Sequence, residues 1–224
     1  MSTTINKIGV IGAGAWGTAL AKHLADKGLE VLLWAYEHDV VNAINTSHEN
    51  PVFLRDILLP PGLTATSSLI EAVSNRDGVL FAVPSHLTRS VLRQLAPCFS
   101  APLPFVCATK GIEENTAKLM SHVMEDELPP SMHRSLMVLS GPSFASELSA
   151  GKPTAVCLAG PDEHLVRRFQ SALMTPVFRV YADTDVIGVQ LGGALKNVMA
   201  LAAGVIDGLD LGLNARAALI TRGL

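Results

Sequence analysis

The sequence has few charged residues and no block of basic ones. Only 17% of its 224 residues are charged, and the formal net charge is −3 at pH 7. A protein that binds nucleic acid, or that docks electrostatically on a membrane, needs a concentrated positive patch. We therefore expect neither kind of partner.

Cysteine is also scarce. Cys98, Cys107 and Cys157 lie far apart in apolar stretches, and no two of them have the spacing of a metal-ligand pair. This pattern is typical of reduced thiols in the core of a cytoplasmic protein, so we expect no metal site. The N-terminal stretch MSTTINKIGVIGAGAW lacks the basic region, apolar core and cleavage site of a signal peptide. A cytoplasmic location follows as an expectation.

The chain contains no repeat of fixed period, no low-complexity segment and no flexible linker. Its most apolar stretch, residues 189–208, is interrupted by the polar side chains of Gln190, Lys196 and Asn197. A membrane-spanning helix needs about 20 residues that are predominantly apolar. We therefore expect no stable membrane insertion.

The first 35 residues predict the opening of a doubly wound Rossmann-type α/β sheet. A buried strand is expected at residues 7–11, a helix at about 16–27 and a second strand at 30–35. Gly28 follows the helix and is suited to capping its C-terminus. A strand, a glycine turn, a helix and another strand within about thirty residues are typical of a dinucleotide-binding unit.

The glycine turn, Gly12-Ala13-Gly14-Ala15-Trp16-Gly17, lies between the first strand and the helix. Such a turn lets the backbone approach a pyrophosphate and directs a helix N-terminus at its charge. We therefore expect Gly12, Gly14 and Gly17 to bind a dinucleotide. A tight turn without a ligand is the alternative.

Strands and helices continue to alternate as far as Asp183. Strands are expected at residues 78–83, 105–109, 136–140, 154–159 and 177–181, and helices at 39–46, 87–95, 117–127, 144–149 and 162–173. The proline-bounded segment 50–61 is expected to be a loop with a short extended piece. This pattern predicts a dinucleotide-binding domain over residues 1–183.

The character of the chain changes after Asp183. An apolar helix is expected from about Asp185, and another from Ala215 with Asn214 as its N-cap. We interpret residues 184–224 as the start of an all-α C-terminal domain. A helix that is apolar on most faces must be buried on several sides. The missing partners come either from a second copy of the chain, as in a homodimer, or from further chain beyond Leu224, and we favour the latter.

Residues suited to binding follow four of the predicted strands. They are Gly12 to Gly17, Pro84-Ser85-His86, Thr109-Lys110-Gly111 and Gly141-Pro142-Ser143. In an open parallel sheet, ligands bind outside the carboxyl ends of the strands. Consecutive parallel strands bring these four segments to one edge.

The end of the second strand commonly distinguishes NAD from NADP through an acidic residue on the ribose. Ala35 and Tyr36 occupy that end here, and Glu37 lies just beyond them. No arginine is adjacent to attract a 2′-phosphate. NAD and NADP therefore stay open as alternatives.

Lys196 is the one lysine in the apolar stretch 189–208. At helical spacing it shares a face with small or apolar residues such as Gly192, Gly193 and Met199. Burial of an unpaired ammonium disfavours its charged form, which suits a group that transfers protons near neutral pH. The alternative is a lysine that reaches water from an otherwise buried helix.

The motifs GAGAWGTALA, VPSH, ATKGI, SGPSFASEL, GVQLGGALKNVMALAAGVIDGL and NARAALITRGL together resemble bacterial NAD(P)-dependent glycerol-3-phosphate dehydrogenase. The segment NPVFLRDILLP resembles that family as well, and the similarity runs from about Ile8 to Leu224. The resemblance implies an enzyme that interconverts sn-glycerol 3-phosphate and dihydroxyacetone phosphate with NAD or NADP. It also implies a role in phospholipid synthesis.

The resemblance further implies roles for individual residues. The cofactor would contact Ala15, Trp16, Tyr36, Lys110 and Ala145, and the substrate would contact Lys110, Gly141, Ser143 and Lys196. Lys196, the lysine of GALKN, would be the proton donor and acceptor. Tyr36 stands where some relatives carry histidine or another polar group.

Family members continue for roughly another hundred residues of helical domain, about one domain's worth. That part carries an aspartate and a Ser-Arg-Asn group that hold the substrate. Two other interpretations therefore stay open. One is a catalytically incomplete dinucleotide-binding fragment, and the other is a related hydroxyacid dehydrogenase, which is not expected to carry ATKG and SGPS together.

Overall fold

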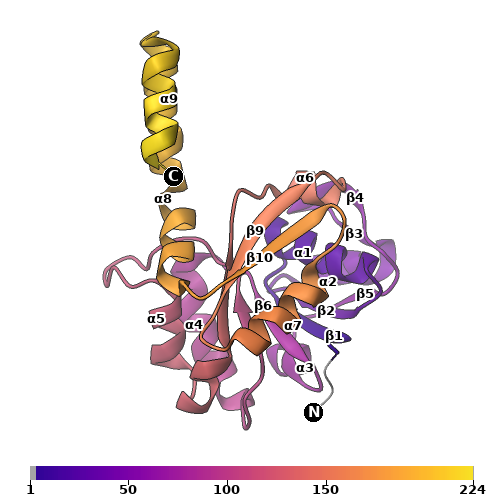
Figure 1. Cartoon of the computed structure of the whole chain (residues 1–224). Helices are drawn as coiled ribbons and strands as arrows, with labels where there is room; N and C mark the ends of the chain where they lie inside the picture. The colour runs from indigo at the N-terminus through magenta and orange to yellow at the C-terminus, as the bar shows by residue number, and fades with distance from the viewer. Residues whose placement is uncertain (1–3, 224) are drawn as a thin grey trace.

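An eight-stranded sheet runs through the body of the protein, and a pair of helices projects from one end of it (Figure 1). The computed structural model describes residues 4–223. The strands of the main sheet are β1 (Lys7–Ile11), β2 (Glu30–Trp34), β5 (Leu63–Thr66), β6 (Gly78–Phe81), β7 (Phe105–Cys107), β8 (Leu136–Ser140), β9 (Thr154–Ala159) and β10 (Phe178–Asp183). A separate hairpin contains β3 (Glu49–Asn50) and β4 (Leu54–Leu58).

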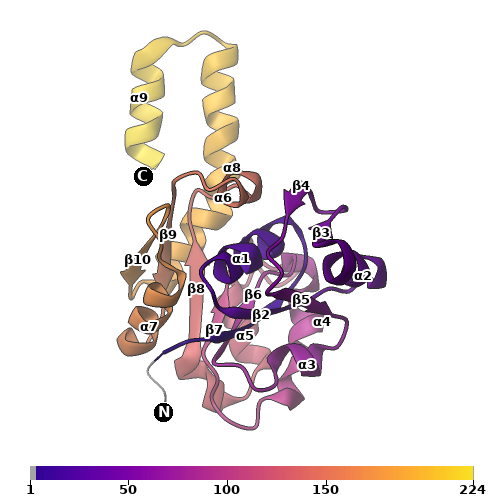
Figure 2. The same ribbon diagram turned by 90° about the vertical axis from the view of Figure 1, so that its right-hand side faces the viewer.

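Helices lie on both faces of the sheet (Figure 2). Those packed around the sheet are α1 (Ala15–Asp26), α2 (His38–Ser47), α3 (Leu69–Val73), α4 (Ser85–Leu95), α5 (Met120–Glu127), α6 (Ala145–Ser149) and α7 (Glu163–Leu173). The projecting pair consists of α8 (Val186–Gly208) and α9 (Gly212–Gly223). Short 3-10 helices lie at Ala96–Cys98 and Pro130–Ser135. The alternating elements confirm the predicted α/β class.

Neighbouring residues of the central strands point into two different cores. Val10 of β1 packs in the core that contains α1 and α7, whereas Ile11 packs in the core that contains α4 and α5. Leu80 and Phe81 of β6 divide in the same way. Because both faces are covered, the strands are apolar runs without polar alternation.

The strand order is β10-β9-β8-β7-β6-β1-β2-β5. From β5 to β8 every pair is parallel, which is the order of a doubly wound dinucleotide-binding sheet. The strands β1, β6, β7 and β8 therefore end at one edge, as predicted. Strand β9 runs antiparallel to β8, and β10 runs parallel to β9.

Some element boundaries differ from the predictions. The strand β5 and the helix α3 were not predicted, because four and five residues are too short to show a periodic pattern. The helix α5 begins at Met120 rather than at Ala117, whose φ of +54° is left-handed and stops a helix there. The helix α9 begins at Gly212, so Asn214 lies in its first turn and is not its N-cap.

The predicted burial of the apolar helix is wrong. Of the residues in α8, only Gln190 is buried, and its amide donates to Ser121 Oγ (2.9 Å) and accepts from the Ser121 N–H (2.8 Å) in α5. Beyond its first turns α8 leaves the sheet and packs against α9 (Figure 2). This α8–α9 hairpin exposes the apolar side chains Leu191, Leu195, Val198, Leu201, Val205, Leu209, Leu213 and Ile220.

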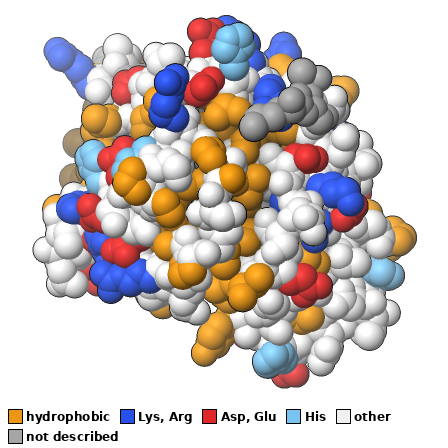
Figure 3. Space-filling view, turned by 90° about the horizontal axis from the view of Figure 1, so that it is seen from below, with side chains coloured by type: hydrophobic (Ala, Val, Ile, Leu, Met, Phe, Trp, Pro, Cys, Tyr) orange, Lys and Arg blue, Asp and Glu red, His pale blue; other side chains and the backbone are white. Residues whose placement is uncertain are grey.

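By length and composition, α8 is also the one helix in the described part of the chain that could cross a membrane. Core helices of soluble proteins pass the same test. On the face opposite the hairpin, acidic and basic side chains are interspersed among apolar ones (Figure 3). No block of a single charge gathers on that face.

Candidate functional site

The glycine turn connects the carboxyl end of β1 to the N-terminus of α1. Gly12 has a φ of +111°, and its N–H donates to the Trp34 carbonyl at 3.1 Å. A Cβ on Gly17 would lie only 1.8 Å from the Gly12 carbonyl oxygen, whereas a Cβ on Gly14 would meet nothing within 4 Å. Gly12 and Gly17 are thus required by the turn itself. Gly14 leaves open space at the helix N-terminus, where the sequence predicts that a pyrophosphate binds.

Two cavities meet at Gly14 and share Val83 and Pro84. The larger, of about 540 Å³, extends toward Tyr36 and Glu37 at the end of β2. The smaller, of about 300 Å³, extends toward Lys110 and Ser143. Together they form a cleft across the strand ends, which we call the dinucleotide cleft because a dinucleotide is the ligand predicted for the glycine turn.

Asn50 braces the glycine turn from behind. This fully buried side chain donates to the Ala13 carbonyl (2.9 Å) and to Thr18 Oγ1 (2.8 Å), and it accepts from the Phe53 N–H (3.1 Å). The sequence predicted a loop beginning at Asn50 and gave no contact between Asn50 and the glycine turn. The sequence signal that could have pointed to Asn50 is its place at the start of the family-like segment NPVFLRDILLP.

Lys110 is the lysine at the centre of the predicted substrate site. Its Nζ donates to the Gly141 carbonyl (2.9 Å) and to Ser143 Oγ (3.0 Å), and it lies 5.5 Å from the centroid of the Trp16 ring. Burial, and secondarily the positive charge of Lys196, lower the pKa of Lys110. The structure therefore brings four of the predicted site residues into direct contact.

Lys196 lies on α8 near this group, and its side chain is exposed. The interpretation as a buried lysine is therefore wrong, and the alternative, a lysine that reaches water, describes its exposure. The Nζ of Lys196 is 5.8 Å from the centroid of the Phe144 ring. Lys196 and Gly141 both line a third cavity of about 520 Å³. The exposure arises because α8 moves away from the sheet, so that Lys110 is the more buried of the two lysines.

Gly193 allows α8 to approach β8 closely. A Cβ at this position would lie 2.1 Å from Ser140 Oγ and 3.8 Å from Lys110 Cγ. The Ser140 hydroxyl is buried and has no hydrogen-bond partner among the described residues. The small residues that the sequence showed around Lys196 therefore bring the helix close to the strand ends.

Two predicted cofactor contacts are less central. Tyr36 is 80% exposed and lies at the rim of the dinucleotide cleft. Ala145 begins α6, which packs against α1, and it lines neither cavity of that cleft. The cofactor contacts of Tyr36 and Ala145 stay predictions, like those of the other predicted site residues.

The loop that follows Lys110 is held by a cluster of charges. The Arg89 guanidinium on α4 donates to both carboxylate oxygens of Glu113 at 2.8 Å, to Asp126 at 3.0 Å and to Glu127. Hydrogen bonds from Arg89, and then from Thr116, lower the pKa of Glu113 to about 2. The sequence interpretation missed this cluster, whose members are separated by up to 38 residues.

The three cysteines are all free. Burial raises the pKa of the Cys107 thiol to about 11. Among the described residues, no group of three or more His, Cys, Asp and Glu side chains is arranged to hold a metal ion.

Models of one protein family match most of the chain. The model described as NAD-dependent glycerol-3-phosphate dehydrogenase N-terminus matches residues 7–166, and the model of the C-terminus matches residues 185–224. Among curated relatives, glycerol-3-phosphate dehydrogenase (NAD(P)+) of Geobacter sulfurreducens is 52% identical over 97% of this chain and 65% of its own length. The Myxococcus xanthus protein of the same name is 50% identical over 96% of this chain and 64% of its own length.

Solved structures are similar to the chain over nearly all of it. Glycerol-3-phosphate dehydrogenase from Coxiella burnetii superimposes with a TM-score of 0.85 at 38% identity, covering 99% of this chain and 67% of that one. The enzyme from Saccharomyces cerevisiae has a TM-score of 0.85 at 28% identity, covering 98% and 68%. The chain thus spans about 65% of the length of the first curated relatives.

Proposed function

Because the chain belongs to the NAD-dependent glycerol-3-phosphate dehydrogenase family, we propose that it takes part in interconverting sn-glycerol 3-phosphate and dihydroxyacetone phosphate. The cofactor is NAD or NADP. The observation that carries this proposal is the contact of Lys110 with Gly141 and Ser143, next to Trp16 in the glycine turn. A dinucleotide in the cleft and a phosphorylated substrate beside Lys110 would therefore be neighbours.

Each part of the cleft has a distinct role in this proposal. The glycine turn and the N-terminus of α1 hold the pyrophosphate, and Asn50 keeps the turn in shape. Lys110, the Gly141 backbone and the Ser143 hydroxyl bind the substrate. The ammonium of Lys110 is suited to an anion because both oxygens to which it donates are neutral and no carboxylate among residues 4–223 pairs with it.

The glycine turn and Trp16 would hold the nicotinamide cofactor, which would supply the hydride chemistry at C2 of dihydroxyacetone phosphate or sn-glycerol 3-phosphate. Lys196 completes the reaction by moving one proton. In the reducing direction its ammonium protonates the C2 oxygen, which becomes the hydroxyl of glycerol 3-phosphate. In the oxidising direction its neutral amine accepts the hydroxyl proton as the carbonyl forms.

Replacing Lys196 tests its role as proton donor and acceptor. We expect Lys196→Met to bind NADH and NADPH normally in calorimetry while losing most of its turnover with dihydroxyacetone phosphate. The matched control is Lys7→Met. Lys7 is an exposed lysine at the N-terminal end of β1, whereas the glycine turn follows the C-terminal end of that strand. Near-normal turnover by Lys196→Met would contradict the role of Lys196 as proton donor and acceptor.

A cofactor-binding part without its own catalysis is a second candidate, supported by the greater length of the curated relatives. Calorimetry with NADH and NADPH beside a turnover assay on the same sample separates the two. Binding with turnover supports the enzyme, and binding without turnover supports the second candidate. Turnover of simple 2- or 3-keto acids in preference to dihydroxyacetone phosphate would instead support a hydroxyacid dehydrogenase.

We also propose that the protein is cytoplasmic and serves phospholipid synthesis. In this proposal residues 1–183 form a dinucleotide-binding domain, and residues 184–224 begin a helical domain.

We propose no stable membrane insertion. The hydrogen bonds of Gln190 with Ser121, and the charged Lys196 in the middle of α8, both disfavour it. The apolar face of the α8–α9 hairpin suits either a second copy of the chain or more helices. Sedimentation measurements distinguish a homodimer from a monomer.

A further inference from the structure

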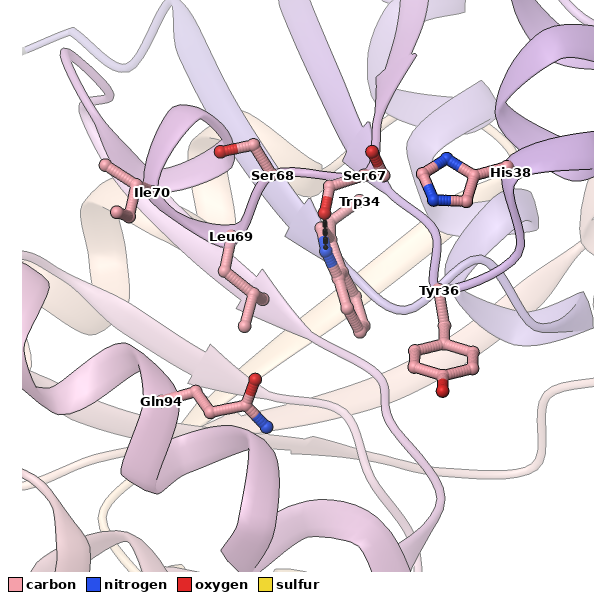
Figure 4. A pocket seen from close by; sticks show the side chains of 8 residues that line it. All are labelled: Trp34, Tyr36, His38, Ser67, Ser68, Leu69, Ile70 and Gln94. Carbon is pink, nitrogen blue, oxygen red and sulfur yellow. Dashed lines mark hydrogen bonds between the residues drawn. The ribbon is translucent and has the colours of Figure 1, made fainter.

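The cavity at the ends of β2 and β5 is an extension of the dinucleotide cleft (Figure 4). It is lined by Trp34, Tyr36 and Gln94, all of which also line the larger cavity of that cleft. Trp34 Nε1 donates to the Ser67 carbonyl at 3.0 Å, which ties the segment after β5 to the end of β2 (Figure 4). This cavity is therefore part of the cleft and not a separate site.

A different cavity, of about 710 Å³, lies at the other end of α1. It is lined by residues 4–6 at the start of the chain, by residues 27–29 after α1 and by positions between 164 and 172 on α7. Among the described residues, it shares none with the dinucleotide cleft. The 12 residues of α1, which span about 18 Å, separate it from the glycine turn. We call it the α1–α7 cavity.

Basic side chains line the α1–α7 cavity. Lys27 follows α1, and the others, His164, Arg167 and Arg168, lie on α7. Both helices pack on the same side of the sheet (Figure 2), so the fold gathers cations that are far apart in the sequence. None of the described residues that line the cavity is acidic. In a chain with a net charge of −3, this is a local concentration of positive charge.

The carboxylates next to these residues in the sequence are paired and lie outside the lining. Glu163 accepts from Arg167 at 2.9 Å, but the two side chains are 66% and 63% exposed. Asp26 pairs with Lys22 at 2.6 Å. An exposed ion pair contributes little to stability. Arg167 therefore loses little if its guanidinium turns from Glu163 to a ligand.

Lys27 is held in place by the end of α7. Its Nζ donates to the Ser171 carbonyl and to the Ala172 carbonyl, the latter at 2.8 Å. Partial burial lowers the pKa of Lys27. These bonds satisfy carbonyls in the last turn of α7 and use two of the three N–H donors of the ammonium. Capping of α7 thus accounts for Lys27, but it does not account for Arg167 and Arg168.

Two apolar side chains also line the cavity. Ile5 is buried, and Leu29 packs against the same core. Cavities of about 300–1,000 Å³ that combine apolar walls with a few polar groups are typical of sites for small molecules. The α1–α7 cavity therefore suits a small organic anion better than a protein or a membrane surface.

We propose that the α1–α7 cavity binds a small phosphate ester, with Lys27, Arg167 and Arg168 as the donors to its phosphate group. Ile5 and Leu29 contact the organic part. A phosphate group carries about two negative charges and accepts hydrogen bonds from several directions, which suits cations that come from two elements. A planar carboxylate suits a single guanidinium fork. The site is separate from the dinucleotide cleft and takes no part in hydride or proton transfer.

Calorimetry with phenyl phosphate tests this site in the whole chain. NADH is kept at saturation, because the glycine turn would otherwise attract the same anion. We expect phenyl phosphate to bind, and its affinity to fall as sodium chloride is added, because salt screens exposed charges. Absence of binding would overturn the proposal.

Two further ligands test the chemistry of the site. Benzoate keeps the ring and replaces the phosphate by a carboxylate, and it should bind about tenfold more weakly. Inorganic phosphate lacks the ring and should also bind more weakly, because it leaves Ile5 and Leu29 without an apolar partner. Benzoate that binds as tightly as phenyl phosphate would overturn the preference for phosphate. Inorganic phosphate that does so would overturn the apolar contact.

Variants locate the bound phosphate. Arg167→Gln and Arg168→Gln should each weaken phenyl phosphate binding about tenfold, the effect of one hydrogen bond to a charged group. The matched control is Arg179→Gln, which removes an exposed arginine of β10 outside the cavity. NADH should bind equally to all of these proteins. Thermal melting checks that each is folded, and Arg167→Gln decides the question if Arg168→Gln melts early, because Arg167 is exposed.

The outcomes separate this site from the dinucleotide cleft. Equal affinity for phenyl phosphate in Arg167→Gln, Arg179→Gln and the unaltered chain would overturn the α1–α7 site and leave the cleft standing. Binding that depends on Arg167 in a chain that fails to bind NADH would support the α1–α7 site and overturn the cleft.

Discussion

Gly14 and Gly17 lie three residues apart in one turn, yet they are glycine for different reasons. A side chain on Gly17 would collide with the backbone oxygen of Gly12, which cannot move without opening the turn. A side chain on Gly14 would extend into free space inside the dinucleotide cleft. One glycine serves the fold, and the other leaves room for a ligand.

Substitution by alanine should therefore affect mainly stability at Gly17 and mainly ligand binding at Gly14. Gly17→Ala should lower the free energy of unfolding by about 3 kcal/mol or more, at the upper end of overpacking costs. Gly14→Ala should lower it by less than about 1 kcal/mol but weaken NADH binding. Urea unfolding and calorimetry measure the two quantities. A stable Gly17→Ala protein with normal NADH affinity would contradict the role given to Gly17.

Lys110 should make anion binding unusually sensitive to alkaline pH. Its pKa lies below the ordinary lysine value of 10.5 because burial, and then Lys196, disfavour its charge. Only the protonated form attracts a phosphate, so affinity for glycerol 3-phosphate should fall as the pH rises toward 10.5. The free energy of unfolding should rise over the same pH range. The pKa of this lysine is higher in the unfolded chain, which therefore binds more protons than the folded protein there.

Calorimetry at a series of pH values measures this decline. Lys110→Arg is the control, because a guanidinium with a pKa above about 12 stays charged throughout. Its affinity should be weaker at neutral pH but flat with pH. A decline of the same shape in both proteins would show that another group titrates.

At the scale of elements, the Arg89 cluster joins α4, α5 and the loop after Lys110. The side chains of Arg89, Glu113 and Glu127 are 22%, 13% and 11% exposed, so this cluster is more shielded than an ordinary surface ion pair. The loop itself closes through a bridge between Ile112 and Leu119. The cluster and this bridge together fix the direction in which the chain continues after Lys110.

Arg89→Ala should therefore destabilise the protein by about 1–2 kcal/mol, because it leaves several carboxylates without their shared partner. Arg167→Ala is the matched control, since Arg167 makes only an exposed pair with Glu163 and should cost about 0.5 kcal/mol or less. Urea unfolding measures both changes. Equal losses in the two variants would mean that the cluster contributes no more than a surface pair.

Because of the cluster, the free energy of unfolding should also depend on pH in the acidic range. The pKa of Glu113 is lowered from 4.5 to about 2, so its stabilising contribution is present above 4.5 and is lost as the pH falls toward 2. In Glu113→Gln this part of the acid dependence should disappear. Unfolding curves of the two proteins across that range provide the test, and parallel curves would contradict the assignment.

At the scale of the whole molecule, the protein consists of a well-packed sheet and a hairpin with little support. Most of the buried apolar side chains belong to the sheet and the helices that cover it, whereas α9 has no buried residue. Local unfolding is easiest where few apolar contacts are lost. The two parts should therefore differ in stability.

Hydrogen exchange should reveal this difference as a gradient along α8. Amides near Gln190 should be protected because its side chain is anchored to α5, and amides beyond about Val198 and throughout α9 should exchange much faster than those of β1 or β6. Mass spectrometry of exchanged peptides gives the profile. Uniform protection from α8 to α9 would indicate that the apolar face is covered in solution.

The sequence by itself determined the strand–glycine–helix opening, most strand positions and the meeting of Lys110, Gly141 and Ser143 at one edge. These features depend on local steric rules and on period, which neighbouring residues are sufficient to specify. Gly12 and Gly17, for example, have conformational requirements that a few residues express. The apolar runs of the central strands express burial on both faces in the same way.

Only the tertiary structure decided the antiparallel placement of β9, the exposure of Lys196 and the brace at Asn50. Each depends on residues that are distant in sequence, such as Asn50 with Ala13. The apolar stretch 189–208 predicts a buried helix. Burial requires other elements to pack against that helix, and in the described chain they cover only the first turns of α8. Long-range contacts of this kind leave no periodic signal in a single sequence.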